Sequence, residues 1–153
     1  MRHDIGEISA NNSGLKLLPQ RTQGGILLVD VNEISGQIVD AAIKVHSVLG
    51  PGLLESTYEG CLLFELHKRG LNAVSQVELP VRYEEVRIDV GYRIDIVVEG
   101  AIILELKSVD KIHPIHRAQL LSYLKLSDKK LGLLLNFNVM LMKDGIERIV
   151  NNL

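Results

Sequence analysis

The stretch Tyr92-Arg-Ile-Asp-Ile-Val-Val-Glu-Gly-Ala-Ile-Ile-Leu-Glu-Leu-Lys-Ser108 decides how this chain folds. Its two runs of Val, Ile and Leu are typical of strands, and the Glu-Gly-Ala triplet between them is typical of a turn. Asp95, Glu105 and Lys107 interrupt the apolar runs. A carboxylate buried in such a strand requires a counter-charge. We therefore expect the three residues to share one polar site, which a divalent cation would satisfy.

Strand geometry relates these residues to one another. Glu105 and Lys107 lie two positions apart and therefore on the same face of a strand. A three-residue loop at Glu99-Gly-Ala101 would place Asp95 opposite Glu105 on that face, whereas a two-residue loop would put the carboxylates on opposite faces. The shared polarity of the three residues favours the three-residue loop.

Apposed carboxylates indicate a particular chemistry. They repel each other, so the metal-free site would raise one pKa or admit a cation. Oxygen-only ligands favour Mg²⁺ or Mn²⁺ over zinc. Such an ion beside an ammonium group is the equipment of phosphodiester hydrolysis. The alternative is a structural ion pair among Asp95, Glu105 and Lys107, and spacing alone does not decide between the two.

The whole chain has the composition of one soluble globular domain. It has 153 residues, of which 46% are hydrophobic and 24% charged, enough to bury a core. The formal net charge of -2 argues neither for nor against an anionic partner. The stretch from Lys107 to Lys130 is locally basic, with six Lys or Arg against two Asp, a net of +4.

Two further features bear on where the protein works. Cys61 is the only cysteine and has no intramolecular disulfide partner, which indicates a small buried side chain in a reducing compartment. No apolar run approaches the roughly 18 residues of a membrane span, and the N-terminus lacks the order of a signal peptide. The predicted location is the cytoplasm, without a membrane partner.

The hydrophobic periodicity predicts an α/β fold with a mixed sheet flanked by helices, in the order ααβββαββ. Residues 1–31 carry no sustained periodicity and are predicted to be a poorly ordered extension before a domain at residues 32–153. The predicted helices are Ile34–Leu49, Leu53–Arg69 and Pro114 to about Leu126, and the predicted strands are Val74–Tyr83, Val86–Val98, Ile102–Ser108, Leu131–Phe137 and Ile146–Val150.

Five motifs follow one another along the chain. They are Gly52-Leu-Leu-Glu-Ser-Thr-Tyr58, Tyr92-Arg-Ile-Asp95, Leu104-Glu-Leu-Lys-Ser108, Gln119-Leu-Leu-Ser-Tyr123 and Leu131-Gly-Leu-Leu-Leu-Asn-Phe137. In this order, from about Glu33 to Asn151, the chain resembles the GxxExxY protein family of the PD-(D/E)XK nuclease superfamily. The resemblance implies a restriction-endonuclease-like core. One departure is Ile94, which stands where the superfamily motif has Pro.

The resemblance also implies roles for the polar residues. Asp95 and Glu105 would hold Mg²⁺ or Mn²⁺, with the Leu106 main-chain carbonyl as a further ligand. Lys107 would orient or activate the attacking water. Glu55 would reach the same site from the second helix, as an extra ligand to the ion or to its water.

Gln119 and Tyr123 lie four residues apart and therefore on one helix face. They resemble the QxxxY motif of RecB-like and Cas4-like nucleases, which implies a position beside the metal centre and a role in substrate binding. A Gln and a Tyr at an ordinary boundary between helix and sheet are the alternative.

Three residues are expected to bind nucleic acid outside the metal centre. Lys111 and Arg117 precede or open the third helix and suit phosphate contacts, although a solvated basic face would look the same. The hydroxyl of Tyr58 is placed to bond a carboxylate or a phosphate, and core packing would explain Tyr58 equally. His113 and His116 have no further Cys or His nearby, so zinc is not expected there.

The leading hypothesis is a Mg²⁺-dependent nuclease that hydrolyses DNA phosphodiester bonds. An alternative is a catalytically silent module on the same fold that binds nucleic acid or a partner, as a homo-oligomer or within a larger repair or defence complex. A third hypothesis is a structural or toxin–antitoxin-like interaction protein whose polar strand is an ion-pair network. Fold analogy alone does not decide among them.

Overall fold

A five-stranded mixed sheet forms the centre of residues 30–152, the part of the chain that this computed structural model describes. Three neighbouring strand pairs are antiparallel, whereas β3 and β4 are parallel because a helix connects them. This confirms the predicted fold class. In sheet order the strands are β1 Ala73–Tyr83, β2 Val86–Val98, β3 Ile102–Lys107, β4 Leu131–Asn136 and β5 Ile146–Val150.

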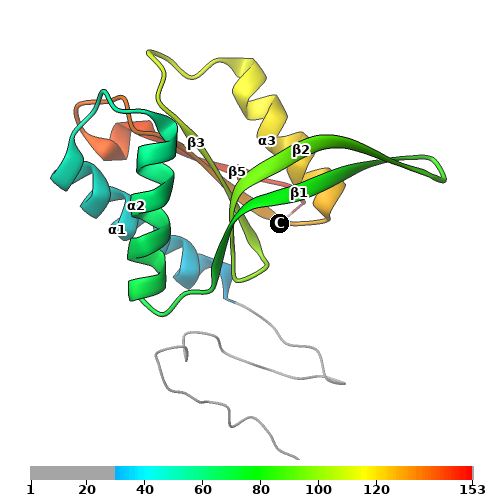
Figure 1. The fold of residues 1–153 in the computed structure, drawn as a ribbon, viewed down its shortest axis with the longest axis horizontal. Helices are drawn as coiled ribbons and strands as arrows, with labels where there is room; N and C mark the ends of the chain where they lie inside the picture. The colour runs from blue at the N-terminus through cyan, green and yellow to red at the C-terminus, as the bar shows by residue number, and fades with distance from the viewer. Residues whose placement is uncertain (1–29, 153) are drawn as a thin grey trace, which may run out of the picture.

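Helices cover both faces of the sheet (Figure 1). The helices α1 (Val31–Leu49) and α2 (Glu55–Lys68) pack on one face, and α3 (Pro114–Ser127) packs on the other. Asp30 caps α1, since its Oδ1 accepts hydrogen bonds from the N–H groups of Asn32 and Glu33 at 3.1 and 3.2 Å. Of the predicted extension at residues 1–31, Asp30 and Val31 cap and open α1, and residues 1–29 lie outside the described part of the chain.

The central strand β3 separates two hydrophobic clusters. Leu104 and Leu106 belong to the cluster beneath α1 and α2, whereas Ile103 belongs to the cluster beneath α3. Glu105 and Lys107 have the parity of Ile103 and therefore face α3. The predicted alternation of β3 is confirmed, and its two charged side chains lie on the helix α3 side of the sheet.

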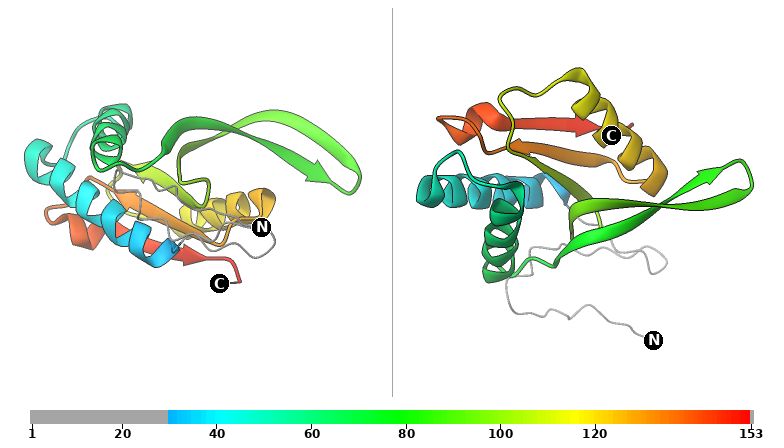
Figure 2. Two further views of the ribbon diagram at one scale, coloured as in Figure 1. Left: turned by 90° about the horizontal axis from the view of Figure 1, so that it is seen from below. Right: turned by 45° about the horizontal axis from the view of Figure 1, so that its top comes forward.

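The strands β1 and β2 form a long hairpin that projects beyond the rest of the sheet (Figure 2). The ladder between β2 and β3 is short, running only from the pair Val98–Ile102 to the pair Ile96–Leu104. Beyond that point β2 continues into the hairpin while β3 continues beside β4. The two strands therefore separate at Asp95.

Asn136 organises the chain just beyond the ends of β3 and β4. Its side-chain amide bonds the main-chain N–H of Val109 at 3.1 Å and the carbonyl of Val109 at 3.0 Å. Gly145, which ends the 3-10 helix η3 (Met142–Gly145), packs against the main-chain carbonyl of Asn136. A side chain at position 145 would overlap that carbonyl. Within residues 30–152, no helix combines the length and the apolar character that crossing a membrane requires.

We expect Gly145→Ala to destabilise the protein by about 2 kcal/mol or more, because the added Cβ overlaps main-chain atoms that cannot yield as a side chain would. Gly36→Ala is the matched control, since Gly36 lies within α1 with open space around it, and alanine there should add about 0.5–1 kcal/mol of stability. Denaturant unfolding measures both changes. Equal stability of the two variants would contradict the described packing at Gly145.

Candidate active site

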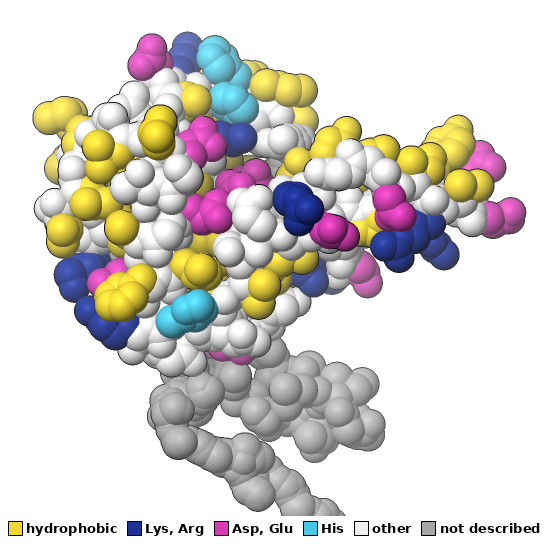
Figure 3. Space-filling model, in the orientation of Figure 1, with side chains coloured by type: hydrophobic (Ala, Val, Ile, Leu, Met, Phe, Trp, Pro, Cys, Tyr) yellow, Lys and Arg dark blue, Asp and Glu magenta, His cyan; other side chains and the backbone are white. Residues whose placement is uncertain are grey.

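Two carboxylates bridge the fork where β2 and β3 separate. The Leu106 main-chain N–H donates to Asp95 Oδ2 at 2.8 Å, and the Asp95 N–H donates to Glu105 Oε2 at 3.1 Å. Position 95 lies opposite position 105 because the register of the pair Ile96–Leu104 continues to them. The loop between the strands therefore has three residues, as predicted. In Figure 3, acidic side chains gather in the middle of one face, between α2 and the base of the hairpin.

The surroundings of Asp95 and Glu105 disfavour the charged form of both carboxyl groups. Burial, followed by the charge of Asp95, raises the pKa of Glu105 to about 8, and only 4% of the Glu105 residue surface is exposed. Burial also raises the pKa of Asp95, although the hydrogen bond from the Leu106 amide acts in the opposite direction. Burial is thus the main cause for both carboxyls, and the repulsion between the apposed pair adds to it at Glu105.

Glu65 shows how the same protein neutralises a buried carboxylate. It is 8% exposed, and its oxygens lie 3.6 Å from Lys44 Nζ, 3.4 Å from Lys68 Nζ and 3.9 Å from Arg69 Nε. Burial alone would raise the pKa of Glu65, but these three cations lower it below its usual value. Glu105 has no Lys, Arg or His within ion-pair distance among residues 30–152. Among the described residues, the fork therefore lacks the direct cationic partners that would keep its carboxyls ionised, as Glu65 is kept.

Lys107 is held beside the carboxylates by α3. Its Nζ donates to Gln119 Oε1 at 3.2 Å, and Gln119 Nε2 donates to the Tyr123 hydroxyl at 3.3 Å. The ammonium charge lowers the pKa of both Asp95 and Glu105, yet within residues 30–152 it makes no direct ion pair with either. The structural ion pair that the sequence left open is therefore not formed. The structure brings Gln119 and Tyr123 together with Lys107 in one hydrogen-bonded chain.

Glu55 approaches the fork from the first turn of α2. Ser108 Oγ, directly after β3, donates to the carbonyl of Leu53 at 2.7 Å and so fastens the loop before α2 to the end of β3. The Glu55 charge raises the pKa of both Asp95 and Glu105, which places it within electrostatic reach. No three His, Cys, Asp or Glu side chains of residues 30–152 converge closely enough to hold a metal together. Glu55 is therefore a neighbour of the carboxylate pair rather than a third member of it.

Tyr58 buttresses this loop from inside the core. Its side chain is fully buried and its ring stacks on Phe137, with centroids 4.4 Å apart. The hydroxyl donates to the Gly50 carbonyl at 2.6 Å and accepts from the Leu53 N–H at 3.1 Å. In this structure the hydroxyl is occupied by main-chain groups and the ring by core packing, as the packing alternative describes, and the phosphate contact of Tyr58 stays a prediction. Tyr58 lies only three residues after Glu55, which suggested a shared site. Its ring, however, points into the hydrophobic core and not toward the fork.

The basic residues do not form one patch at the fork. Arg117 makes a bidentate ion pair with Glu147 at 2.6 and 2.9 Å, whereas Lys111 is exposed between β3 and α3. The His113 N–H donates to His116 Nδ1 at 3.0 Å, so this pair caps the start of α3. The remaining lysines of the basic stretch lie at the opposite end of the sheet, where Lys125 is in the last turn of α3 and Lys129 and Lys130 follow the helix.

Sequence reasoning missed two neighbours of the site. Glu59 raises the pKa of Asp95 by its charge and is bonded by Gln76 Nε2 at 2.9 and 3.1 Å. Its position one helical turn after Glu55 places both on one face of α2, and that spacing was a usable signal. His116 was placed at a loop edge where zinc was not expected, but burial and the nearby charge of Lys107 lower its pKa.

Comparison with known proteins bears directly on this arrangement. The family model described as the PD-(D/E)XK nuclease superfamily matches residues 32–149, which include all the residues at the fork. The match is to the superfamily as a whole, so the finer resemblance to GxxExxY proteins stays a prediction. The searches of curated proteins and of solved structures found no match.

We expect Glu105→Gln to stabilise the metal-free protein increasingly as the pH rises from about 5 to about 8. The unfolded carboxyl ionises near 4.5 and the folded one near 8, so in this window the folded state retains a proton that the unfolded state loses. Wild-type stability therefore falls with pH, by at most about 1.4 kcal/mol per pH unit. Thermal unfolding of both proteins in a chelator measures the stability difference at each pH. If the stabilities of the two proteins changed in parallel with pH, the raised pKa of Glu105 would be contradicted.

We expect Tyr58→Phe to cost about 1–2 kcal/mol of stability, because the ring still stacks on Phe137 while two hydrogen bonds to the loop are lost. Tyr83→Phe is the matched control, since Tyr83 is 64% exposed on the hairpin and should be neutral. Chemical denaturation measures the free energy of unfolding of both variants and of the wild type. Neutral stability of Tyr58→Phe would show that the hydroxyl does not hold the loop.

Proposed function

Because the chain belongs to the PD-(D/E)XK nuclease superfamily, we propose that it is a metal-dependent nuclease that hydrolyses DNA phosphodiester bonds. The observation that carries this proposal is the pair of apposed carboxylates without a direct ion-pair partner, the buried Glu105 and the half-buried Asp95, with Lys107 held beside them. A binding role alone gives no reason to keep two such groups together, because their burial costs stability.

The donor set fits a hard divalent cation. Each carboxylate uses one oxygen to accept a main-chain N–H, and no described residue bonds Asp95 Oδ1 or Glu105 Oε1. The Leu106 carbonyl would add a third oxygen, and Glu55 would contribute through a water. All of these donors are oxygens, as Mg²⁺ and Mn²⁺ prefer, and Mg²⁺ usually keeps several waters. When bound, such a cation polarises a phosphoryl oxygen and lowers the pKa of a bound water.

The remaining residues position the reactants. Gln119 fixes the Lys107 ammonium, which would orient or activate the attacking water and offset negative charge developing on the phosphate. Burial, followed by the charge of Glu105, raises the pKa of Tyr123, so its hydroxyl keeps the proton that it can donate to substrate. Lys111 is free to contact a flanking phosphate, whereas Arg117 would first have to leave Glu147.

The finer predictions from the sequence belong to this proposal. These are the choice of Mg²⁺ or Mn²⁺, DNA as the substrate, membership of the GxxExxY family and a cytoplasmic location. Assembly as a homo-oligomer or within a repair or defence complex is also retained. The catalytically silent binding module is the second candidate, favoured by one observation: the described residues bring together no three side chains able to hold a metal.

We expect Asp95→Asn and Lys107→Met each to lower kcat/KM for DNA cleavage by about 100-fold or more, because each removes a group that acts on the reacting phosphate or its water. The matched controls are Asp40→Asn on the exposed side of α1 and Lys143→Met in η3, which should cleave like the wild type. Purified proteins are compared on labelled single- and double-stranded DNA with Mg²⁺ or Mn²⁺.

Two results would count against the nuclease. One is equal cleavage by the wild type and Asp95→Asn, which would assign the activity to a contaminant or to another site. The other is no cleavage by the wild type with either metal and either DNA, combined with DNA binding that survives Asp95→Asn. That second result would favour the silent binding module.

A further inference from the structure

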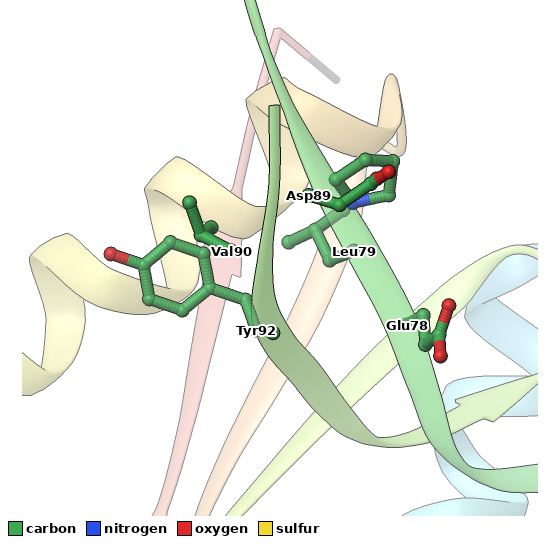
Figure 4. A pocket seen from close by; sticks show the side chains of 7 residues that line it. Glu78, Leu79, Asp89, Val90 and Tyr92 are labelled. Carbon is green, nitrogen blue, oxygen red and sulfur yellow. The ribbon is translucent and has the colours of Figure 1, made fainter. Parts of the chain in front are cut away.

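Tyr92 places an exposed aromatic ring next to the hydrogen-bonded chain that holds Lys107. The ring extends from β2 toward α3 (Figure 4), and its centroid lies 6.1 Å from that of Tyr123 at an angle of 49°. Tyr123 is only 7% exposed and accepts the hydrogen bond from Gln119, whereas Tyr92 is 48% exposed. One side of the Tyr92 ring thus rests near a buried partner while much of the residue remains open to solvent.

Exposed apolar side chains lie along the side of β2 that carries Tyr92, although the pocket that Tyr92 lines also includes Glu78 and Asp89. Val90 lies on the same side of β2 as Tyr92, and Asp89 lies on the other (Figure 4). Val90 is 50% exposed and Ile88, further along the strand, is 41% exposed. A surface of adjacent exposed apolar side chains beside a catalytic centre marks a place where a ligand binds.

Charge excludes one kind of ligand from this surface. Duplex DNA is bound mainly through contacts of Lys and Arg with phosphates. The fork is acidic, and Arg87, Arg93 and Arg117 are already paired with Asp89, Glu78 and Glu147. Lys129 and Lys130 lie at the opposite end of the sheet, which leaves Lys111 near the site and Arg82 near the hairpin tip. Binding at the fork therefore has to come largely from another source, and stacking of bases on an aromatic ring is the one that the described surface offers.

We propose that Tyr92 stacks on an unpaired base of the substrate beside the scissile phosphate, so that the preferred substrate is single-stranded DNA. This inference rests on the proposed nuclease function and names its substrate class. Tyr92 itself is a substrate-binding residue, because its ring would touch the base. Its contact with Tyr123 would link the bound base to the Gln119–Lys107 pair that faces the phosphate.

The test is a binding measurement in a chelator, so that cleavage does not interfere. A fluorescein-labelled oligonucleotide of about 12 nucleotides and the corresponding duplex are titrated with each protein, and anisotropy is recorded. We expect the single strand to bind more tightly than the duplex. Tyr92→Ala should weaken single-strand binding by roughly 5- to 150-fold, whereas Tyr92→Phe, which keeps the ring, should bind like the wild type.

Tyr83→Ala is the matched control, because Tyr83 is a 64% exposed tyrosine on the same hairpin, near its tip. It should retain near wild-type affinity. The chain has no Trp, and Tyr58 and Tyr123 are buried, so quenching of tyrosine emission by an added oligonucleotide reports largely on the two exposed hairpin tyrosines. Quenching by the single strand should persist in Tyr83→Ala and be largely lost in Tyr92→Ala.

Several outcomes would overturn the inference. They are wild-type affinity in Tyr92→Ala, a Tyr92→Phe variant as weak as Tyr92→Ala, and equal weakening in Tyr83→Ala. A further one is a concentration-dependent dimer in sedimentation that Tyr92→Ala dissociates while oligonucleotide binding is unchanged, which would make this face a contact between two copies of the chain.

Cleavage assays separate this inference from the proposed function. If the wild type cuts duplex and single strand equally and Tyr92→Ala matches it, the nuclease stands and the inference fails. If the wild type cuts nothing but binds single strands through Tyr92, the catalytic proposal fails and the binding residue stands.

Discussion

The structure depends on the exchange of hydrogen bonds between side chains and main chain at the fork of β2 and β3. Where the strand ladder stops at the pair Ile96–Leu104, Asp95 and Glu105 carboxylates accept the N–H groups of Leu106 and Asp95. Buried main-chain donors need such partners. The same bonds fix both carboxylates in place, allow β2 to leave the sheet as a hairpin, and leave one oxygen of each carboxylate without a described partner.

The elements around the fork add an ammonium group, an aromatic ring and a fixed loop to the two carboxylates. Gln119 on α3 holds the Lys107 ammonium group beside the carboxylates, and the hairpin brings Tyr92 of β2 next to Tyr123. From the other face, the loop before α2 is fixed by Ser108 and by Tyr58. A GxxExxY motif thus has a physical meaning in this chain. Gly52 has a φ of +95°, which lets the loop turn, the Glu opens the helix near the site, and the Tyr secures the loop from the core.

Local rules predicted the elements and much of the site. The strand period predicted the parity of β3, and the shared polarity of Asp95, Glu105 and Lys107 favoured the three-residue loop that places Asp95 opposite Glu105. Contacts between distant segments were beyond such rules. The burial of Tyr58 depends on Phe137, and the pairing of Arg117 with Glu147 joins residues 30 positions apart. In the same way, three cations from two helices neutralise Glu65, and no periodicity indicates that this carboxylate is compensated while Glu105 is not.

The most direct test of the uncompensated carboxylate pair is a crystal structure with Mn²⁺, located by its anomalous scattering. Our account requires an anomalous peak within coordination distance of both Asp95 and Glu105 in the wild type, and no such peak in an Asp95→Asn crystal. A wild-type map with no ion at the fork at saturating Mn²⁺, or with Lys107 displaced from Gln119 into an ion pair with Glu105, would contradict it.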